Sequence, residues 1–406
     1  MNPSDGVVLS QLALSDRRER IFKTLGYYVA FVSLGLVTAS LGPTLPGLAE
    51  HTQSQTGRIS LLFTAYSLGY LSGSFQGGRW YDREPGHRVM AIMLVAMFAL
   101  MACVPVVSSL WVLLAAWLIL GAAAGTLDVG GNTLLVWVHR DQVGPYMNGL
   151  HFFFGVGAFL SPLIIDRAML LGGDIIWAYW ALALLMLPGL AWLLRLPSPT
   201  TELVSEDNPQ GQVNYSLLAL IVLFFFLFSG AELGYGGWIF SYATALQVAD
   251  QTVAAHLTSG FWGALTLGRL LAVPIAARLR PRFVLGGSLV GCLASAGPIL
   301  LWPNSLEAIW LSTLGMGLFM ASVFPSMLSL AGRHMNITGR LTGWFFVGAS
   351  LGGMVLPWMM GQLFERIGPS AAMVALAFDL AIATGVFAGI LFYLARPGAS
   401  RPPMGS

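Results

Sequence analysis

Charged side chains are scarce in this sequence. Asp, Glu, Lys and Arg make up 9% of its 406 residues, whereas hydrophobic residues make up 56% and the mean hydropathy is +0.74. A water-soluble domain of this length carries far more charge, so the composition excludes that class. The net charge is only +2, which gives no indication of a nucleic-acid partner.

Cysteine is also nearly absent. Cys103 and Cys292 both lie in apolar stretches, and we interpret them as packing residues rather than as a disulfide or a metal pair. The sequence has no metal-ligand cluster, no nucleophile–base set and no phosphate-binding loop, so it does not indicate an enzyme or a bound cofactor. A sodium ion is the one bound species that we consider below.

Long apolar segments fill most of the chain. Each can form a helix that crosses about 30 Å of hydrocarbon, and we predict an all-α integral membrane protein of about 12 transmembrane helices. The segments fall near 24–49, 57–81, 87–107, 110–138, 145–170, 174–195, 214–246, 253–279, 283–302, 306–332, 338–364 and 370–395. The predicted domains are a cytoplasmic segment 1–20, a six-helix bundle 21–196, a cytoplasmic linker 197–213, a second bundle 214–396 and a tail 397–406.

The sequence contains an internal repeat. Residues 117–140 align without a gap with residues 310–333, so that a Trp begins and an Arg ends each copy. Residues 149–162 also resemble residues 343–357, with a slip of one position. We therefore predict two pseudo-symmetric bundles related by an axis along the membrane normal, which is an architecture of alternating-access transporters.

Basic residues predict the orientation. With both termini in the cytoplasm, 16 of the 20 Lys and Arg residues lie at inner positions, three lie in outer loops, and Arg269 lies within a helix. This asymmetry agrees with an even number of helices and with an inner or plasma membrane protein. The inner residues are Arg17, Arg18, Arg20, Lys23, Arg79, Arg83, Arg88, Arg140, Arg195, Arg278, Arg280, Arg282, Arg333, Arg340, Arg396 and Arg401.

One acid, Asp128, interrupts the fourth apolar segment. Asn132 follows one helical turn later on the same face, whereas Gly121 and Gly125 form a small-xxx-small pair that allows another helix to approach closely. An ionised carboxylate in this position costs about 2.5–3.5 kcal/mol on insertion scales, so a functional role is favoured over a tolerated polar pair between helices. We predict a cation-coupling site at Asp128 and Asn132, with either a proton or a sodium ion as the coupling species.

The seventh segment carries a second acid, Glu232, followed by aromatic residues. Glu232 and Tyr235 share a helix face, and Tyr235 and Trp238 do too. Carboxylates bond sugar hydroxyls, and aromatic rings cover the apolar faces of sugars. We predict that these three residues bind substrate, with Trp262 and Phe324 nearby; the alternative is a gating helix with interfacial aromatics.

Further polar residues complete the predicted site. Asn148 and His151 lie one turn apart at the start of the fifth helix, and we include them among the substrate-binding residues although a packing role is the alternative. Arg269 is the only buried cation, and we predict that it neutralises a nearby acid. The three acids Asp128, Glu232 and Asp379 outnumber it, so the bundle favours a neutral substrate over an anion.

Motifs in four helices and one loop resemble a known family over nearly the whole chain. They are Gly125–Asn132 (GTLDVGGN), Leu150–Ala158 (LHFFFGVGA), Gly237–Tyr242 (GWIFSY) after Glu232, and Ser322–Pro325 (SVFP). The loop Gly78–Arg88 resembles the signature loop of the major facilitator superfamily, with Gly78, Asp82, Arg83, Gly86 and Arg88 at the signature positions and Pro85 as an extra residue. The resemblance implies that this loop gates the inner face.

Within that superfamily the motifs are similar to the fucose-permease-like branch, and most of all to the sodium-dependent glucose transporter type. The resemblance implies sugar uptake coupled to protons or sodium. The fucose-permease pattern also places an acid in the first helix, where this sequence has none, whereas its acid in the fourth helix corresponds to Asp128.

We therefore predict a secondary active transporter that carries a neutral sugar such as a hexose in symport with a cation. The alternative is a proton-coupled exporter of a drug or small metabolite, although the fifth helix matches the Gly-Pro-rich pattern of such exporters poorly. We expect a monomer in the lipid bilayer, with a small-molecule sugar as its substrate. The residues do not distinguish sodium from proton coupling, and they do not name the sugar.

Overall fold

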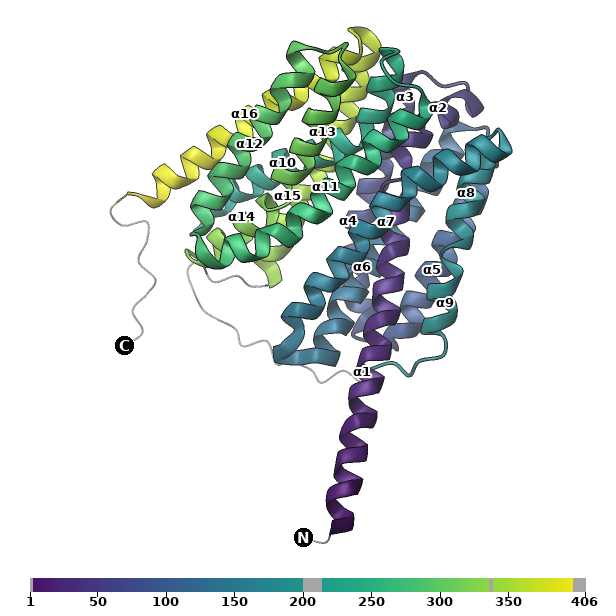
Figure 1. The fold of residues 1–406 in the computed structure, drawn as a ribbon, viewed down its shortest axis with the longest axis vertical. Coiled ribbons are helices and arrows are strands. Elements are labelled where there is room, and N and C mark those ends of the chain that lie inside the picture. The colour runs from purple at the N-terminus through teal and green to yellow at the C-terminus, as the bar shows by residue number, and fades with distance from the viewer. Residues whose placement is uncertain (1–2, 200–213, 336–338, 397–406) are drawn as a thin grey trace.

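The computed structural model describes residues 3–199, 214–335 and 339–396, and this part of the chain is helical with no strand (Figure 1). The predicted all-α class is therefore confirmed. The elements are α1 (Pro3–Thr38), α2 (Leu41–His51), α3 (Thr56–Ile59), α4 (Leu61–Tyr81), α5 (Gly86–Cys103), η1 (Val104–Val106), α6 (Leu110–His139), η2 (Arg140–Gln142), α7 (Val143–Gly172), α8 (Ile175–Leu184), α9 (Leu187–Leu193), α10 (Tyr215–Ala245), α11 (Gln251–Arg278), α12 (Pro281–Leu301), α13 (Leu306–Met320), α14 (Val323–Gly332), α15 (Gly339–Arg366) and α16 (Pro369–Leu394).

The helices reproduce the predicted apolar segments. By length and composition, 11 spans among the described residues can cross a membrane. Helix α4 is not one of them, although its 21 residues suffice for a crossing and it packs among the others. Glycines, serines and Gln76 dilute the apolar character of α4, and they matter for its packing.

Prolines explain three interruptions in the predicted segments. A proline lacks an N–H group and its ring collides with the carbonyl of the residue four positions earlier. The helix accordingly breaks after Thr38 ahead of Pro43, after Leu184 ahead of Pro188, and after Met320 ahead of Pro325. The last helical residue lies four or five positions before the proline in each case, so α1–α2, α8–α9 and α13–α14 each correspond to one predicted segment.

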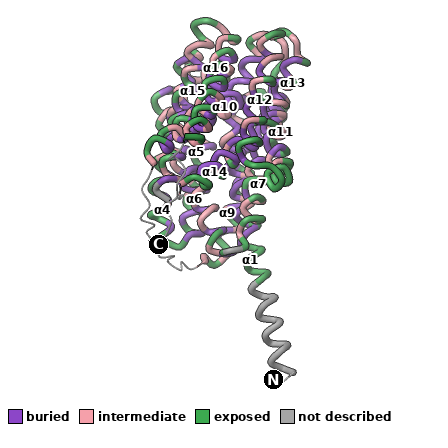
Figure 2. Tube along the Cα trace, turned by 90° about the vertical axis from the view of Figure 1, so that its left-hand side faces the viewer, coloured by how far each residue is buried: buried purple, intermediate pink, exposed green. Residues whose placement is uncertain are grey.

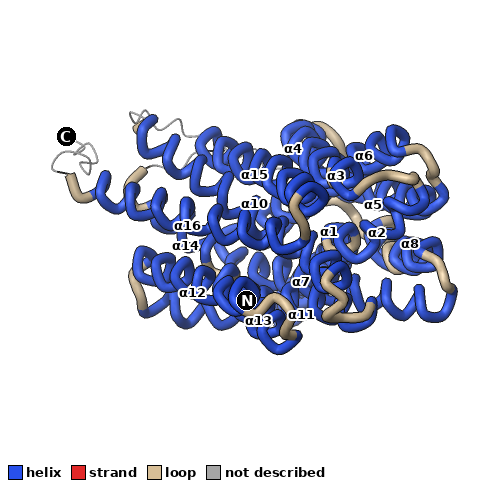
Figure 3. Tube along the Cα trace, turned by 90° about the horizontal axis from the view of Figure 1, so that it is seen from above, coloured by secondary structure: helices blue, strands red, loops and turns tan. Residues whose placement is uncertain are grey.

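The helices form two groups that follow the two halves of the chain. Seen from above, α4, α5, α6 and α8 lie on one side, and α12, α13, α14 and α16 lie on the other (Figure 3). In each half the second predicted segment packs on the fourth, as α4 on α6 and as α11 on α13. Trp117 and Trp310 occupy the fourth segment of their own half, as the repeat requires.

The exact limits of the predicted domains stay a prediction. Most of the predicted linker 197–213 and all of the predicted tail 397–406 lie outside the described residues. Helix α1 begins well before residue 21, so the predicted boundary at residue 20 falls inside a continuous helix.

Glycines bring α4 and α6 into direct backbone contact. A Cβ atom on Gly69 would overlap the carbonyl oxygen of Leu118, and one on Gly121 or Gly125 would overlap a backbone carbonyl of α4. The predicted role of the Gly121–Gly125 pair is confirmed. In the second half, Gly317 approaches the backbone of α11 in the same manner.

The two halves meet at the end of the molecule opposite the start of α1, which we call the outer end. There the backbone N–H of Gly57 donates to the Glu365 carboxylate, and the Gln362 amide donates to the Gly57 carbonyl. Thr252 donates to Asp166 at 2.7 Å, which joins α11 to α7. Figure 1 shows the halves close together at this end and diverging toward the inner end, where α1 begins.

Apolar side chains cover much of the outside of the molecule. Buried positions line the interior of both halves, whereas exposed positions run along their outer faces (Figure 2). Trp111, Phe378 and Phe392 are exposed by 72%, 68% and 66% of their surfaces. A surface of this kind is stable against lipid tails rather than against water.

Candidate functional site

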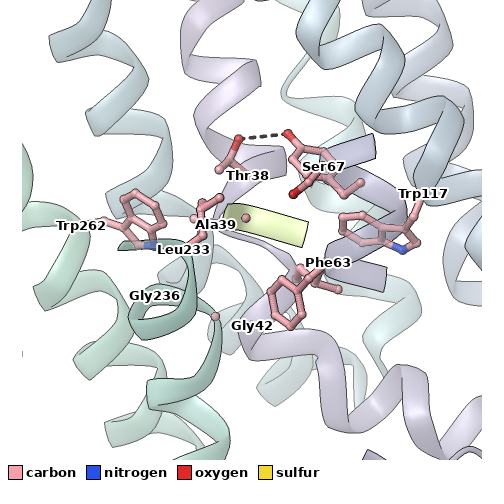
Figure 4. A pocket seen from close by; sticks show the side chains of 13 residues that line it. Thr38, Ala39, Gly42, Phe63, Ser67, Trp117, Leu233, Gly236 and Trp262 are labelled. Carbon is pink, nitrogen blue, oxygen red and sulfur yellow. Dashed lines mark hydrogen bonds between the residues drawn. The ribbon is translucent and has the colours of Figure 1, made fainter. Parts of the chain in front are cut away.

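A cavity lies between the two halves near the outer end. The cavity is small and partly open to solvent, and its walls come from both halves of the chain. Trp117 and Trp262 flank it from opposite sides (Figure 4). The lining residues are Thr38, Ala39, Leu41, Gly42, Phe63, Tyr66, Ser67 and Trp117 from the first half, and Leu233, Gly236, Gly237, Trp262 and Gly353 from the second.

The polar groups of the cavity come mainly from the first half. The Thr38 and Tyr66 hydroxyls lie 3.2 Å apart in a hydrogen bond, drawn as the dashed line in Figure 4, and Ser67 adds a third hydroxyl. The Tyr66 ring meets the Trp117 ring edge-to-face at a centroid distance of 5.8 Å. Hydroxyls beside aromatic rings can bond the polar edge of a ligand and cover its apolar face.

Two indole N–H groups at the cavity have no partner in the described chain. Trp117 and Trp262 are 1% and 3% exposed, and the Nε1 atom of each is buried without a hydrogen bond. Buried donors of this kind are rare because leaving one unpaired costs about 1–3 kcal/mol. Figure 4 shows the six-membered ring of Trp117 toward the cavity and its nitrogen on the far side, so Trp117 contributes an apolar ring surface to the wall.

The face of α10 that lines the cavity differs from the predicted one. Leu233, Gly236 and Gly237 face the cavity, so the predicted face of Glu232, Tyr235 and Trp238 is turned by one residue, or about 100°. None of these three residues lines the cavity. The prediction grouped the residues of α10 into helix faces correctly. It then assigned the cavity to the face with the acid and the aromatic residues, whereas the face with the glycines lines it.

Tyr235 and Trp238 are instead fixed in the protein interior. The Tyr235 hydroxyl bonds Thr313 at 2.8 Å, and the Trp238 indole N–H donates to the Pro357 carbonyl at 2.9 Å. Both side chains are fully buried. They hold α10 against its neighbours, which leaves Trp262 as the one predicted substrate residue in the cavity wall.

Glu232 forms the predicted pair with Arg269. The Arg269 guanidinium lies 3.6 Å from Glu232 Oε1, and the two side chains are 31% and 17% exposed. His151 of α7 lies close enough to Arg269 for the two groups to interact electrostatically, and its ring meets Phe31 edge-on at 6.1 Å. This cluster therefore joins a balanced ion pair of the second half to a histidine of the first.

Asp128 is held by two donors, one on each of two helices. The Tyr70 hydroxyl of α4 donates to Oδ2 at 2.7 Å, and the Asn132 amide nitrogen donates to Oδ1 at 3.1 Å. The same nitrogen donates to the Asp128 carbonyl at 2.9 Å. The amide nitrogen of Asn132, and not its oxygen, thus faces Asp128. No group of three or more His, Cys, Asp or Glu residues in the described chain could hold a metal ion.

The remaining predicted residues lie apart from the cavity wall. Asn148 is exposed on α7, and the Phe324 ring packs at a tilt against Phe225, with a centroid distance of 4.7 Å. Asp379 is 4% exposed and lies at a small space between α10, α15 and α16. Its Oδ2 atom is buried without a hydrogen-bond partner in the described chain, and Asp379 is not among the residues that line the cavity between the halves.

The sequence reasoning missed the polar residues of α4. Tyr66, Ser67 and Tyr70 were not singled out, and Trp117 was noted only as the first residue of the repeat. Tyr66 and Tyr70 are one turn apart beside Gly69 and Gly73, so a tyrosine pair next to a glycine stripe was the available signal.

Comparison with known proteins decides the family. The Major Facilitator Superfamily profile matches residues 27–255. The human protein named sodium-dependent glucose transporter 1 is 30% identical over 410 residues, which cover 92% of this chain and 79% of that protein. The chain belongs to the major facilitator superfamily. Mouse sodium-dependent glucose transporter 1A is 29% identical, covering 91% of this chain and 96% of that protein.

Solved structures of transporters share the fold. A D-xylose–proton symporter superposes with a TM-score of 0.76 at 13% identity, covering 91% of this chain and 97% of that chain. A bacterial homologue of the lysosomal transporter Spinster, in an inward-facing and occupied conformation, gives 0.76 at 12% identity, covering 95% and 98%. This protein is therefore a multi-pass membrane transporter with the superfamily fold.

The signature loop of the superfamily joins α4 to α5 in this transporter. Gly86 begins α5 and is buried against Leu134, where a Cβ atom would collide with the leucine side chain. Gly78 has open space around it, and Asp82 and Arg83 are exposed. Arg88 lies 3.9 Å from Glu84 on the same surface. The gating role of the loop stays a prediction.

Proposed function

We propose that this protein is a cation-coupled sugar symporter of the cell membrane, with both termini in the cytoplasm. The observation that carries the proposal is the cavity between the halves, where the hydroxyl-bearing residues Thr38, Tyr66 and Ser67 line a space flanked by the rings of Trp117 and Trp262. The names of the glucose-transporting relatives and of the xylose symporter support this reading. The cavity wall carries no charged side chain, which favours a neutral substrate.

Alternating access follows from the way the halves meet. The contacts of Gly57, Thr252 and Glu365 close the outer end, and the halves diverge toward the inner end. Sugar binding in the outward-open state would bring Trp117 and Trp262 toward the same ligand from opposite halves. The energy of those contacts can then drive the closure of the outer end.

The coupling cation is cargo, and we place it at Asp128. The Asp128 carboxylate offers the hard oxygen atoms that sodium prefers, and the Tyr70 hydroxyl and the Asn132 amide hold that carboxylate in place. The described side chains form no ion pair with Asp128, in contrast to Glu232 and its arginine. A cation can therefore bind at Asp128 without first displacing another positive charge.

Trp262→Phe tests the proposed sugar site. The substitution removes an N–H donor that has no partner within the described chain, so we expect little loss of thermal stability. The same change should weaken the binding of radiolabelled glucose to the purified protein by about two- to tenfold, the value of one hydrogen bond.

Trp238→Phe is the matched control for this test. Its indole N–H bonds the Pro357 carbonyl away from the cavity, so this variant should lose stability and keep its glucose affinity. Unchanged glucose binding by Trp262→Phe, together with weakened binding by Trp238→Phe, would place the sugar elsewhere.

A further inference from the structure

Tyr70 is the one described side chain that ties Asp128 to a second helix. Asn132 lies on α6 with Asp128 and also bonds the Asp128 backbone carbonyl, so it moves with the acid. The Tyr70 hydroxyl comes from α4 and donates to Oδ2 at 2.7 Å. A hydrogen bond to a charged acceptor is roughly twice as strong as a neutral one, so this contact joins α4 to the charge state of Asp128.

A cation at Asp128 must change this hydrogen bond. The hydroxyl of a tyrosine can donate a hydrogen or accept a positive partner through its oxygen, but its hydrogen cannot point at a cation. While Asp128 is empty the hydroxyl donates to Oδ2; with a cation beside Oδ2 the hydrogen has to turn away. The occupied and empty states of Asp128 therefore require different orientations of the Tyr70 hydroxyl.

The backbone of α4 cannot absorb this change. Gly125 lies directly on the carbonyl of Tyr70, and Gly121 lies on the carbonyl of Tyr66, with no room for even a methyl group. The close contact fixes both tyrosines against α6. The rearrangement is thus confined to side chains, and the neighbouring aromatic ring is the next group to respond.

The ring next to Tyr70 belongs to the cavity wall. The Tyr66 and Tyr70 ring centroids lie 6.2 Å apart, and the Tyr66 hydroxyl bonds Thr38 at 3.2 Å. Tyr66 and Thr38 both line the cavity. A continuous chain of contacts therefore runs from the Asp128 carboxylate through two tyrosines to a cavity hydroxyl.

The second half lacks every member of this chain. Gly317 of α13 lies against the backbone of Phe261 and Leu265, as Gly121 lies against that of Tyr66 and Tyr70. Neither of those residues carries a hydroxyl, and α13 and α14 carry no acid after Glu307. The tyrosine pair thus occurs in the half whose fourth segment carries an acid.

We propose that Tyr70 is a positioning residue that links cation occupancy of Asp128 to sugar affinity in the cavity, through Tyr66 and Thr38. The inference rests on the proposed function and deepens it. A cation that reorients the Tyr70 hydroxyl also alters the position of the neighbouring Tyr66 side chain in the cavity wall. The cation and the sugar should therefore each bind more tightly in the presence of the other.

The test is the ratio of glucose affinities with and without a saturating cation, measured by equilibrium binding to purified protein in sodium or in choline. The wild-type ratio should lie between about 5 and 150, the usual range of coupling between two sites. In Tyr70→Phe the ratio should fall close to one, while glucose binding without the cation is retained. A purely structural tyrosine would instead weaken glucose binding equally in both solutions.

Tyr81→Phe is the matched control. Tyr81 lies on the same helix, is 1% exposed, and its hydroxyl has no hydrogen-bond partner in the described chain, so this variant should keep the wild-type ratio. Should Tyr70→Phe fail to fold, Tyr66→Phe interrupts the same chain one step further on and must also lower the ratio.

The outcomes separate the two claims. A wild-type protein that binds glucose equally well in sodium, in choline and across pH would overturn the proposed coupled symport itself. A normal wild-type ratio that survives in both Tyr70→Phe and Tyr66→Phe would overturn the role of Tyr70 alone and leave the symport standing.

Discussion

Asp128→Asn is expected to abolish the accumulation of sugar against its gradient while sparing sugar exchange. The substitution preserves size and removes the negative charge that a coupling cation has to neutralise. One positive charge moved through 100 mV supplies about 2.3 kcal/mol, which corresponds to roughly fifty-fold accumulation of a neutral sugar. Without the charge at Asp128 this accumulation should fall to the equilibrium ratio of one.

Proteoliposomes provide the measurement for Asp128→Asn. Net uptake of labelled glucose under an imposed cation gradient reports coupling, and exchange between glucose-loaded vesicles and medium reports the sugar site alone. Asp379→Asn is the control. Asp379 is a buried acid that lies between α10, α15 and α16, away from the cavity between the two halves. If Asp128→Asn still concentrates glucose, Asp128 is a packing residue and the coupling charge has to be sought at Glu232.

Loss of the folded protein is expected when Gly69 and Gly73 are both replaced by Ala. A Cβ atom at either position would overlap a backbone carbonyl of α6, so the two helices must separate. Overpacking at a single position costs about 1–3 kcal/mol, and two adjacent sites draw heavily on a total stability of about 5–15 kcal/mol. The separation would also pull Tyr70 away from Asp128.

Thermal unfolding and size-exclusion chromatography in detergent would detect this loss. The control replaces Gly297 and Gly385, which lie in the helices α12 and α16 with nothing within 4 Å of an added Cβ. Alanine is the better helix former by about 1 kcal/mol, so the control should fold at least as well as the parent protein. A stable, monodisperse Gly69/Gly73 variant would contradict the close packing of α4 and α6.

Much of the fold could be predicted from the sequence because membrane helices are recognisable by the length and hydropathy of their apolar segments. The repeat starting at Trp117 and Trp310 predicted two related halves, and the glycines beside Asp128 predicted a close helix contact. These features can be read along the sequence alone, since none of them depends on which helix face meets the other half. The breaks near Pro43, Pro188 and Pro325 follow from local backbone chemistry as well.

The candidate site was harder to predict because it depends on which helix face meets the other half. On α10 the conspicuous residues Glu232, Tyr235 and Trp238 lie one position away from the face that lines the cavity. The small residues Gly236 and Gly237 take that face because aromatic rings pack against it: a Cβ on Gly236 would lie 2.9 Å from the Trp262 ring, and one on Gly237 would lie 2.6 Å from the Phe63 ring. Tertiary packing determines which face of α10 lines the cavity, and the periodicity of the sequence does not show it.

The most direct test of the central claim is uptake of labelled glucose into proteoliposomes with sodium and pH gradients imposed separately. We predict that one of the two inward gradients drives glucose above its equilibrium concentration, and that dissipating the gradient with an ionophore releases it. Equal, non-concentrative uptake under both gradients would contradict cation-coupled sugar symport.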